Sequence, residues 1–369
     1  MKTHSILVLA MVTLLVGAAT GGTYSGGTGT AEDPYRVATP QDLNDIGNHE
    51  NDWDKHFILV NDVNLAEYTG TQFNRIGTDR NNAFTGVFDG NDHKIWNFTW
   101  DSNGINYVGL FKYVGANGQI KNLGMENVDV NAVEGKRIGG LVGFTEEGTI
   151  INCYSVGSVT GSAVVGGLVG ENSGSIIACY STSTISGISD CSGGLVGFNY
   201  SGTISCCYSS GNVSNQYDDA GGLVGENWLG TIANCCSSAS VSSDEGTGGL
   251  VGGNAEGTIT NCYSTGRVSG GSGGGGLVGF GGSVVNSFWD IETSGCNTSD
   301  GGTGETTAEM KTKSTFTDAG WDFVEIWDMG ENQTYPFLLT EPAGDSSHDG
   351  KVNLIDLAIL ASHWLEERK

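Results

Sequence analysis

The sequence predicts an all-β fold, a right-handed parallel β-helix of about eight coils of ~27 residues with a cap at each end. Two observations carry this prediction. Gly-Gly-Leu-Val-Gly occurs six times, starting at residues 139, 166, 193, 221, 248 and 275, so the starts lie 27 or 28 residues apart. The apolar runs between these copies are short, β-branched and bounded by Gly, Ser and Asn. A unit of this kind is too small to bury a core alone, which favours stacked strands and turns.

A second motif follows each copy: an aliphatic residue, any residue, usually Asn, and then usually Cys-Tyr. The clearest copy is residues 150–154, and residues 284–288 are a degenerate one. Residues 95–98 and 120–123 fit with Phe or Leu at the Cys position, which raises the count to eight coils. We expect three short strands and three turns in each coil, stacked as parallel sheets. The right-handed preference of parallel crossovers predicts the hand.

The repeat positions also predict which side chains point inward. Phe98, Leu123 and Cys153 share one position, so the cysteines there should belong to the core. The predicted core includes Ile95, Phe98, Ile120, Leu123, Ile150, Cys153, Leu168, Leu195, Leu223 and Leu250. The Asn before each Cys should adopt a left-handed bend. A second series should form a turn ladder: Asn172, Asn199, Asn227 and Asn254. The glycines fit positive φ angles or tight packing between coils.

Two further columns leave alternatives open. The tyrosines after the cysteines should form an outward stripe of Tyr154, Tyr180, Tyr208 and Tyr263. We favour a ladder that covers the sheet over a sugar-stacking face, since cross-strand aromatic contacts alone stabilise a sheet. Five of the nine cysteines share one position: Cys153, Cys179, Cys207, Cys235 and Cys262. Buried free thiols are favoured over disulfides there, although some vertical pairs could oxidise. Neither CxxC spacing nor partner histidines suggest a metal site.

The chain divides into five parts. Residues 1–20 resemble a secretory signal peptide, with Lys2, a short apolar run and small residues, which predicts a secreted or cell-surface location. No segment is long enough for a transmembrane span. Residues 21–83 form the predicted N-terminal cap, with a helix starting at Thr39-Pro40 and a strand over residues 56–65. The β-helix occupies residues 84–288, and residues 289–341 form a C-terminal cap.

The C-terminal cap is predicted to contain one or two helical turns at residues 306–313. It also contains an aromatic cluster of Phe316, Trp321, Phe323, Trp327, Tyr335 and Phe337. Packing over the last coil is favoured over a sugar-binding platform, because large aromatic side chains usually serve burial first.

The tail, residues 342–369, has a different character. The stretch from Asp345 to Asp356 has oxygen-bearing side chains at positions 1, 3, 5, 9 and 12, with Gly at position 6. A hard cation needs such oxygens around a sharp turn, so this spacing predicts a Ca²⁺ loop. Asp at position 12 and Ser at position 3 depart from the EF-hand pattern. The residues from Leu354 to Trp364 then have helical spacing.

Two resemblances to known families add to this interpretation. The repeats resemble the GLUG motif, named for its Gly-Leu-aliphatic-Gly core, here residues 140–143 and their copies across roughly residues 80–290. GLUG repeats occur in large bacterial surface proteins, including the non-catalytic part of some immunoglobulin A peptidases. The resemblance implies an exported, surface-associated β-helix and implies no enzymatic activity.

Residues 344–366 resemble one half of a type I dockerin, a calcium module that docks onto cohesins. That resemblance implies Asp345, Ser347, Asp349, Asn353 and Asp356 as side-chain Ca²⁺ ligands, with Lys351 binding through its carbonyl. A complete dockerin has two such segments, and this chain contains one. The partners implied are a cohesin-like protein or a second copy of this chain.

Composition and charge limit the function. The net charge of −26, from 42 acidic and 16 basic residues, disfavours nucleic acid and anionic membranes as partners. We favour a secreted non-catalytic repeat protein that acts as a surface, adhesion or carbohydrate-associated module. The alternative is a carbohydrate-active β-helix enzyme, either a polysaccharide lyase or a glycoside hydrolase.

The coils argue against catalysis on three grounds. Arg267 is the only basic residue between Arg137 and Lys311, so a lyase would lack cationic groups. Glu171 and Glu226 share a repeat position, but Phe198 occupies the coil between them. No HExxH or GxSxG motif occurs, and no catalytic residue is assigned. A cleft lined by facing carboxylates on one sheet would instead favour the enzyme.

Overall fold

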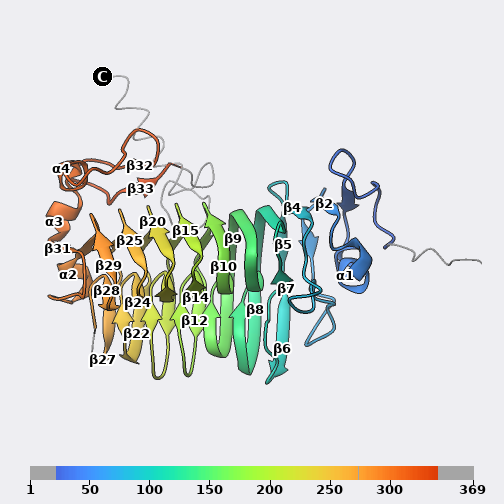
Figure 1. Cartoon of the computed structure of the whole chain (residues 1–369), viewed down its shortest axis with the longest axis horizontal. Helices are drawn as coiled ribbons and strands as arrows, with labels where there is room; N and C mark the ends of the chain where they lie inside the picture. Colours follow the sequence, from blue (N-terminus) through green and yellow to red (C-terminus); the bar gives the residue numbers. More distant parts are fainter. Residues whose placement is uncertain (1–21, 273, 340–369) are drawn as a thin grey trace, which may run out of the picture.

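The computed structural model describes residues 22–272 and 274–339, which form an elongated parallel β-solenoid of about eight turns (Figure 1). The predicted parallel β-helix is therefore confirmed, while its right hand stays a prediction from chain chirality. The predicted signal peptide and calcium loop lie outside the described residues.

The N-terminal part contains one helix and the first stacked strands: β1 (Tyr35–Val37), α1 (Pro40–Asn48), η1 (Glu50–Asp52), β2 (His56–Leu59) and β3 (Val63–Asn64). Helix α1 starts where predicted, because the side chains of Thr39 and Asp42 cap each other's backbone N–H groups. Its Leu43 and Ile46 are buried in the core. The single strand predicted over residues 56–65 is wrong. The chain divides there, because β2 and β3 pair with different strands of the next coil.

The first coils contain β4 (Val87–Asp89), β5 (Lys94–Trp96), β6 (Thr99–Asn103), β7 (Phe111–Val114), β8 (Gln119–Gly139), β9 (Val142–Gly166) and β10 (Val169–Ile177). The long strand β8 pairs along its length first with β4, then with β5 and then with β6. One continuous strand therefore lies beside three shorter strands of the preceding coil. Parallel pairing begins before residue 84, since β1 pairs with β2 and β2 with β4.

The later coils are built from shorter strands. They are β11 (Tyr180–Ser181), β12 (Thr184–Ser186), β13 (Ser192–Gly193), β14 (Val196–Tyr200), β15 (Thr203–Ser205), β16 (Tyr208–Ser209), β17 (Asn212–Ser214), β18 (Ala220–Gly221), β19 (Val224–Trp228), β20 (Thr231–Ala233), β21 (Cys236–Ser237), β22 (Ser240–Glu245), β23 (Thr247–Gly248), β24 (Val251–Ala255), β25 (Thr258–Thr260), β26 (Tyr263–Ser264), β27 (Val268–Ser272), β28 (Val278–Phe280), β29 (Ser283–Val285) and β30 (Phe288–Asp290).

One coil, β14 to β18, shows why the expected three strands per coil is wrong. Its five strands pair in order with β19, β20, β21, β22 and β23. Cys206 has a φ of 52°, and this left-handed residue separates β15 from β16. A sharp bend of this kind interrupts the ladder, so each face of the coil is made of short pieces.

The core is continuous along the solenoid. Each of the ten residues predicted to be buried, from Ile95 to Leu250, is at most 1% exposed. The five stacked cysteines are also buried, and all nine cysteines are free. Burial raises the pKa of the thiols of Cys153, Cys207 and Cys235 well above its ordinary value, so they stay protonated.

The glycines of the repeat serve close packing. A Cβ placed on Gly222 would overlap the carbonyl of Gly249 and the hydroxyl of Ser237. Gly222 does not have a positive φ angle. Tight packing between coils, and not a left-handed backbone, therefore explains the glycine at this position.

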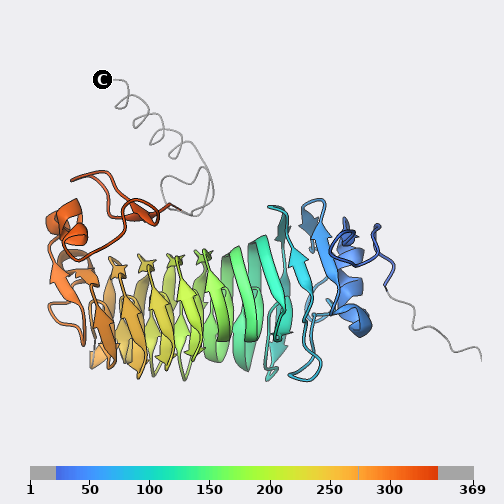
Figure 2. The ribbon, with the colours of Figure 1, turned by 45° about the horizontal axis from the view of Figure 1, so that its top comes forward.

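The C-terminal part folds back along the flank of the last coils (Figure 2). It contains α2 (Ile291–Ser294), β31 (Thr303–Glu305), α3 (Thr307–Met310), α4 (Lys313–Thr317), β32 (Trp327–Asp328) and β33 (Phe337–Leu338). Strand β31 extends the stack by pairing with β30. The cap aromatics include Phe316 and Trp321, which pack against Phe288 of the last repeat and Tyr263 of the repeat before it.

Candidate functional site

The residue directly after each Gly-Gly-Leu-Val-Gly copy belongs to one vertical column, which we call the post-motif column. From strand to strand it contains Phe144, Glu171, Phe198, Glu226, Gly253 and Phe280, all in register. The Phe198 side chain therefore separates Glu171 from Glu226, as predicted, and these two glutamates do not form a pair.

A second column faces the first. The residue two positions before each motif copy forms this pre-motif column of Arg137, Val164, Cys191, Asp219 and Gly246. Contacts cross to the post-motif column of the following coil. Arg137 forms an ion pair with Glu171, and the Cys191 thiol donates a hydrogen bond to Glu226 Oε2 at 3.3 Å.

Gly253 occupies the corresponding place opposite Asp219. A Cβ at Gly253 would lie 3.1 Å from Asp219 Oδ2 and 2.6 Å from Cζ of Phe280. The missing side chain leaves room beside Gly253 for both the Phe280 ring and the Asp219 carboxyl. The two columns therefore meet through an ion pair and a thiol–carboxylate hydrogen bond.

A pocket of about 490 Å³ opens between the two columns, and we call it the acidic pocket. It is lined by Arg137, Val164, Glu171, Asp190, Cys191, Phe198, Asp218, Asp219, Glu226, Glu245, Gly246 and Phe280. The single arginine is paired with Glu171, so carboxyl groups dominate the remaining wall. The phenyl rings of Phe198 and Phe280 complete the pocket wall. A pocket of this size with aromatic walls and converging polar groups is typical of a small-ligand or sugar site.

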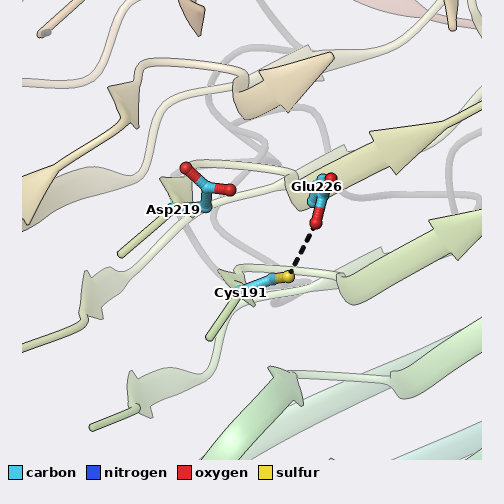
Figure 3. Close-up of side chains that lie close together, drawn as sticks. All are labelled: Cys191, Asp219 and Glu226. Atoms are coloured by element: carbon cyan, nitrogen blue, oxygen red, sulfur yellow. Dashed lines mark hydrogen bonds between the residues drawn. The ribbon is translucent and has the colours of Figure 1, made fainter. Parts of the chain in front are cut away.

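Cys191, Asp219 and Glu226 converge within this pocket (Figure 3). Their sulfur and carboxylate oxygens all lie within 4.8 Å of one another. Asp219 precedes β18 and Glu226 lies in β19, so the two carboxyl groups face each other from different columns. These three residues could also ligate a metal ion. Burial raises the pKa of the Cys191 thiol well above its ordinary value, so in the absence of a metal ion the thiol stays protonated and donates to Glu226.

The surroundings of Asp219 and Glu226 affect the pKa values of their carboxyl groups differently. Burial, with the neighbouring charges of Glu226 and Asp218, raises the pKa of Asp219 to about 7. Burial also raises the pKa of Glu226, but the hydrogen bond from the Cys191 thiol opposes that rise by stabilising the carboxylate. Asp219 is therefore the group that retains its proton close to neutral pH.

Exposed aromatic side chains flank the acidic pocket. Tyr200 and Trp228 lie in register on β14 and β19, two residues beyond Phe198 and Glu226. Because alternate residues of a strand share a face, these rings lie on the same outer face as the pocket. Tyr200 is 46% exposed, Trp228 44% and Phe280 42%. Exposed rings of this size, gathered on one face, are typical of an interaction surface.

Two segments of the chain match a known family model. Residues 134–160 and 243–269 match the GLUG motif. The matched segments include Arg137 and Gly246, which both line the acidic pocket.

Two curated relatives resemble parts of the chain. Halomucin of Haloquadratum walsbyi is 37% identical over 154 residues, which is 40% of this chain and 2% of the relative. A protein named as a candidate Gly-rich membrane protein of Evansella cellulosilytica is 35% identical over 133 residues, which is 35% of this chain and 15% of the relative. The chain thus spans only a small fraction of both relatives.

One solved structure shares the fold. It is a candidate immunoglobulin A1 protease from Bacteroides ovatus, with a TM-score of 0.60 and 22% identity, covering 88% of this chain and 98% of that one. At this identity the likeness shows the β-solenoid alone.

Between residues 22 and 339, residue 273 excepted, no helix has the length and apolarity needed to cross a membrane.

The predicted stripe of four tyrosines forms over Tyr154, Tyr180 and Tyr208, and Cys236 separates these three from Tyr263 in the same column. The rings of Tyr154, Tyr180 and Tyr208 stack at 4.8 and 4.7 Å, with interplanar angles of 9° and 8°. Tyr180, Tyr208 and Tyr263 are buried, in one cluster with the aromatic side chains of the C-terminal cap. Their burial favours the covering ladder over a sugar-stacking face.

The acidic pocket was only partly foreseen from the sequence. Glu226 was considered with Glu171, whereas its partner in the fold is Asp219. The available signal was the pre-motif position, where other coils have Arg, Val, Cys or Gly and this coil has Asp. The six predicted calcium ligands, from Asp345 to Asp356, lie outside the described residues and stay a prediction.

Proposed function

We propose that this chain is an exported, cell-surface repeat protein whose GLUG solenoid binds polysaccharide along one face. The names of the two relatives, a mucin and a membrane protein, support a surface location. The first 20 residues support export, because they have the basic start, apolar run and small residues of a signal peptide.

The observation that carries the glycan proposal is the row of exposed rings beside the acidic pocket. Tyr200, Trp228 and Phe280 present broad apolar surfaces, on which the C–H faces of sugar rings can pack. The carboxyl groups of Glu226 and Asp190 can accept hydrogen bonds from sugar hydroxyls. The cleft therefore combines the two kinds of contact that a polysaccharide requires.

We further propose that the tail binds Ca²⁺ and acts as a docking element. The ligands would be Asp345, Ser347, Asp349, Asn353 and Asp356 with the Lys351 carbonyl. Without a cation, the three aspartates repel one another across the loop. A folded helix after the loop would present Leu357, Leu360 and Trp364 to a cohesin-like protein or a second copy of this chain.

Glycan binding is tested by affinity electrophoresis and calorimetry of the full chain with soluble β-glucan, xylan, galactomannan and chitosan. We expect Tyr200→Ala and Trp228→Ala each to weaken binding by roughly 3- to 10-fold, the loss of one ring contact. Val324→Ala, an exposed apolar side chain in the C-terminal cap, is the control. Unchanged affinity in both ring variants, or no binding by the parent chain, would contradict the proposal.

A further inference from the structure

The acidic pocket holds two carboxyl groups in an arrangement suited to bond cleavage. Asp219 and Glu226 lie on facing columns, with oxygens within 4.8 Å of each other (Figure 3). Two carboxyl groups about 5 Å apart are typical of glycoside hydrolases that retain configuration, in which one carboxylate attacks the sugar directly. Inverting enzymes need about 6.5–9.5 Å, since a water molecule must fit between the base and the sugar.

The surroundings of the pair assign different roles to its members. The Asp219 carboxyl is largely buried in the pocket wall, where it and the Phe280 ring both lie close to Gly253. This desolvation favours the protonated acid. Glu226 instead accepts a hydrogen bond from the Cys191 thiol, which stabilises the carboxylate. Two nearby carboxyl groups in contrasting environments are the usual arrangement of an acid and a nucleophile.

The aromatic rings are an independent observation that points to a sugar ligand at the same place. Glu226 lies in register between Phe198 and Gly253, and Phe280 follows Gly253. Trp228 and Tyr200 extend this surface along the strands. A sugar chain packed on these rings would therefore pass over the carboxyl pair.

From this geometry we propose that the acidic pocket is a retaining glycoside hydrolase site, with Asp219 as the proton donor and Glu226 as the nucleophile. The proposal rests on the glycan-binding function proposed above and adds a reaction to it. A cleft lined by facing carboxylates is the feature expected of an enzyme and not of a simple binding module.

The reaction would proceed in two balanced steps. Asp219 donates its proton to the glycosidic oxygen as the bond from that oxygen to C1 breaks, and the leaving sugar departs as an alcohol. Glu226 simultaneously forms an ester bond to C1. In the second step Asp219, now a carboxylate, takes a proton from water. The water oxygen bonds to C1, the ester bond breaks, and both carboxyl groups return to their starting states.

The charge of the pocket limits the substrate class. Asp190, Asp218 and Glu245 surround the pair, while Arg137 is already paired with Glu171. Uronate polymers would be repelled, because the described residues of the pocket wall include no free cation to neutralise their carboxylates. The substrate is therefore a neutral or amino-sugar polysaccharide.

The test uses the full chain with β-glucan, xylan, galactomannan and soluble chitosan, and polygalacturonate as the anionic comparison. Reducing-end release should occur on a neutral or amino glycan that the chain binds, and proton NMR should show retention at the anomeric carbon. Asp219→Asn and Glu226→Gln should each lower the rate by roughly 10²- to 10⁴-fold. The rate should fall as pH rises through about 7, where Asp219 loses its proton.

Three controls separate this proposal from the binding function. Asp244→Asn, an exposed acid of the same coil outside the pocket wall, should cleave normally. Circular dichroism spectra should be unchanged in the Asp219 and Glu226 variants, which shows that they fold. A 2-deoxy-2-fluoroglycoside of the cleaved sugar should label Glu226, as read by peptide mass.

Binding without any release of reducing ends between pH 4 and 8 would overturn the hydrolase proposal and leave the glycan-binding function standing. Inversion at the anomeric carbon, or full activity of Glu226→Gln, would remove Glu226 as nucleophile and overturn it equally. Absence of glycan binding would remove both proposals together.

Discussion

At the residue scale, a buried asparagine ladder ties the GLUG coils together. The Asn172, Asn199 and Asn227 amides each donate to Oδ1 of the next asparagine at 2.7 Å and to a nearby glycine carbonyl. All four ladder members are fully buried. A buried amide is costly unless it is paired, so the ladder fixes the vertical register of the coils as well as its own side chains.

We predict that Asn227→Ala destabilises the protein by roughly 2–4 kcal/mol. The change removes the hydrogen bonds of the Asn227 side chain with Asn199, Asn254 and the Gly230 carbonyl, so buried polar groups of the ladder lose a partner. Thermal and urea unfolding followed by circular dichroism measure the loss. Asn212→Ala, at an exposed position of β17, is the matched control and should change stability little. Equal effects of the two variants would contradict a structural ladder.

A second residue-scale prediction concerns pH. Folding raises the pKa of Asp219 from 3.8 to about 7, so its contribution to stability is full below about pH 4 and is lost as pH rises toward 7. Asp219→Asn cannot ionise. It should therefore be more stable than the parent at pH 8, by on the order of 1–3 kcal/mol, with no such gain at pH 4. Melting temperatures at pH 4, 6 and 8 test this, with Asp244→Asn as the control. A gain that is independent of pH would show that charge is not its cause.

At the element scale, the C-terminal cap shows how aromatic packing replaces a further coil. Trp321 donates from Nε1 to the carbonyl of Asn286, and Tyr263 donates from its hydroxyl to the carbonyl of Pro336 at 2.5 Å. Trp327 is fully buried within the cap. Trp321 and Tyr263 each use their polar end in a hydrogen bond while their apolar rings are covered, so hydrogen bonds and burial together hold the cap to the flank of the solenoid.

The tail carries the element-scale prediction. By calorimetry, the full chain should bind Ca²⁺ with a dissociation constant on the order of 10⁻⁴–10⁻³ M or tighter, through a site that a chain ending at Leu339 lacks. Asp349→Ala should remove this site, because it deletes a carboxylate from the loop. Glu366→Gln changes an acid outside the loop and should leave binding intact. Identical titrations of the full and shortened chains would contradict the calcium loop.

At the scale of the whole molecule, the solenoid needs a cover at each end. A stack of parallel strands leaves unpaired backbone groups and core side chains at its ends. At the N-terminal end, α1 and η1 lie beside β1, and the rings of Tyr24, Tyr35 and Phe57 pack together at 4.5 to 5.5 Å. The cap thus closes the core in which Phe57 contacts Phe84 and Phe88.

We predict that deleting residues 22–53 makes the protein self-associate. The deletion removes β1, the parallel partner of β2, and uncovers Phe57, so an open strand edge and an apolar end become available to a second molecule. Light scattering after size-exclusion chromatography measures the mass, with the parent chain at the same concentration as the control. A monomeric deletion variant of unchanged melting temperature would show that this cap is dispensable.

The sequence by itself determined the solenoid. Each stacked coil needs the same types of residue at the same positions, so the requirement appears in the sequence as a repeat of fixed length. Leu250, Cys153 and Asn199 were assigned to the core or the turn ladder from repeat position alone, and the structure places them there. Short-range signals were equally informative, as at the capped start of α1. The left-handed residue before each cysteine was predicted and is found, for example at Asn152 and Asn261. The division of the coil from β14 to β18 into five strands was missed, because the ends of such short strands depend on pairing with the neighbouring coils.

The tertiary structure alone decided the acidic pocket. The contact of Cys191 with Glu226 spans 35 residues and joins columns that are offset by one coil. Periodicity shows which residues share a column, but the bending of the chain decides which columns face each other. The raised pKa of Asp219 likewise depends on burial and on the neighbouring charges of Glu226 and Asp218. These are properties of packing in three dimensions, which a repeat pattern along one chain does not contain.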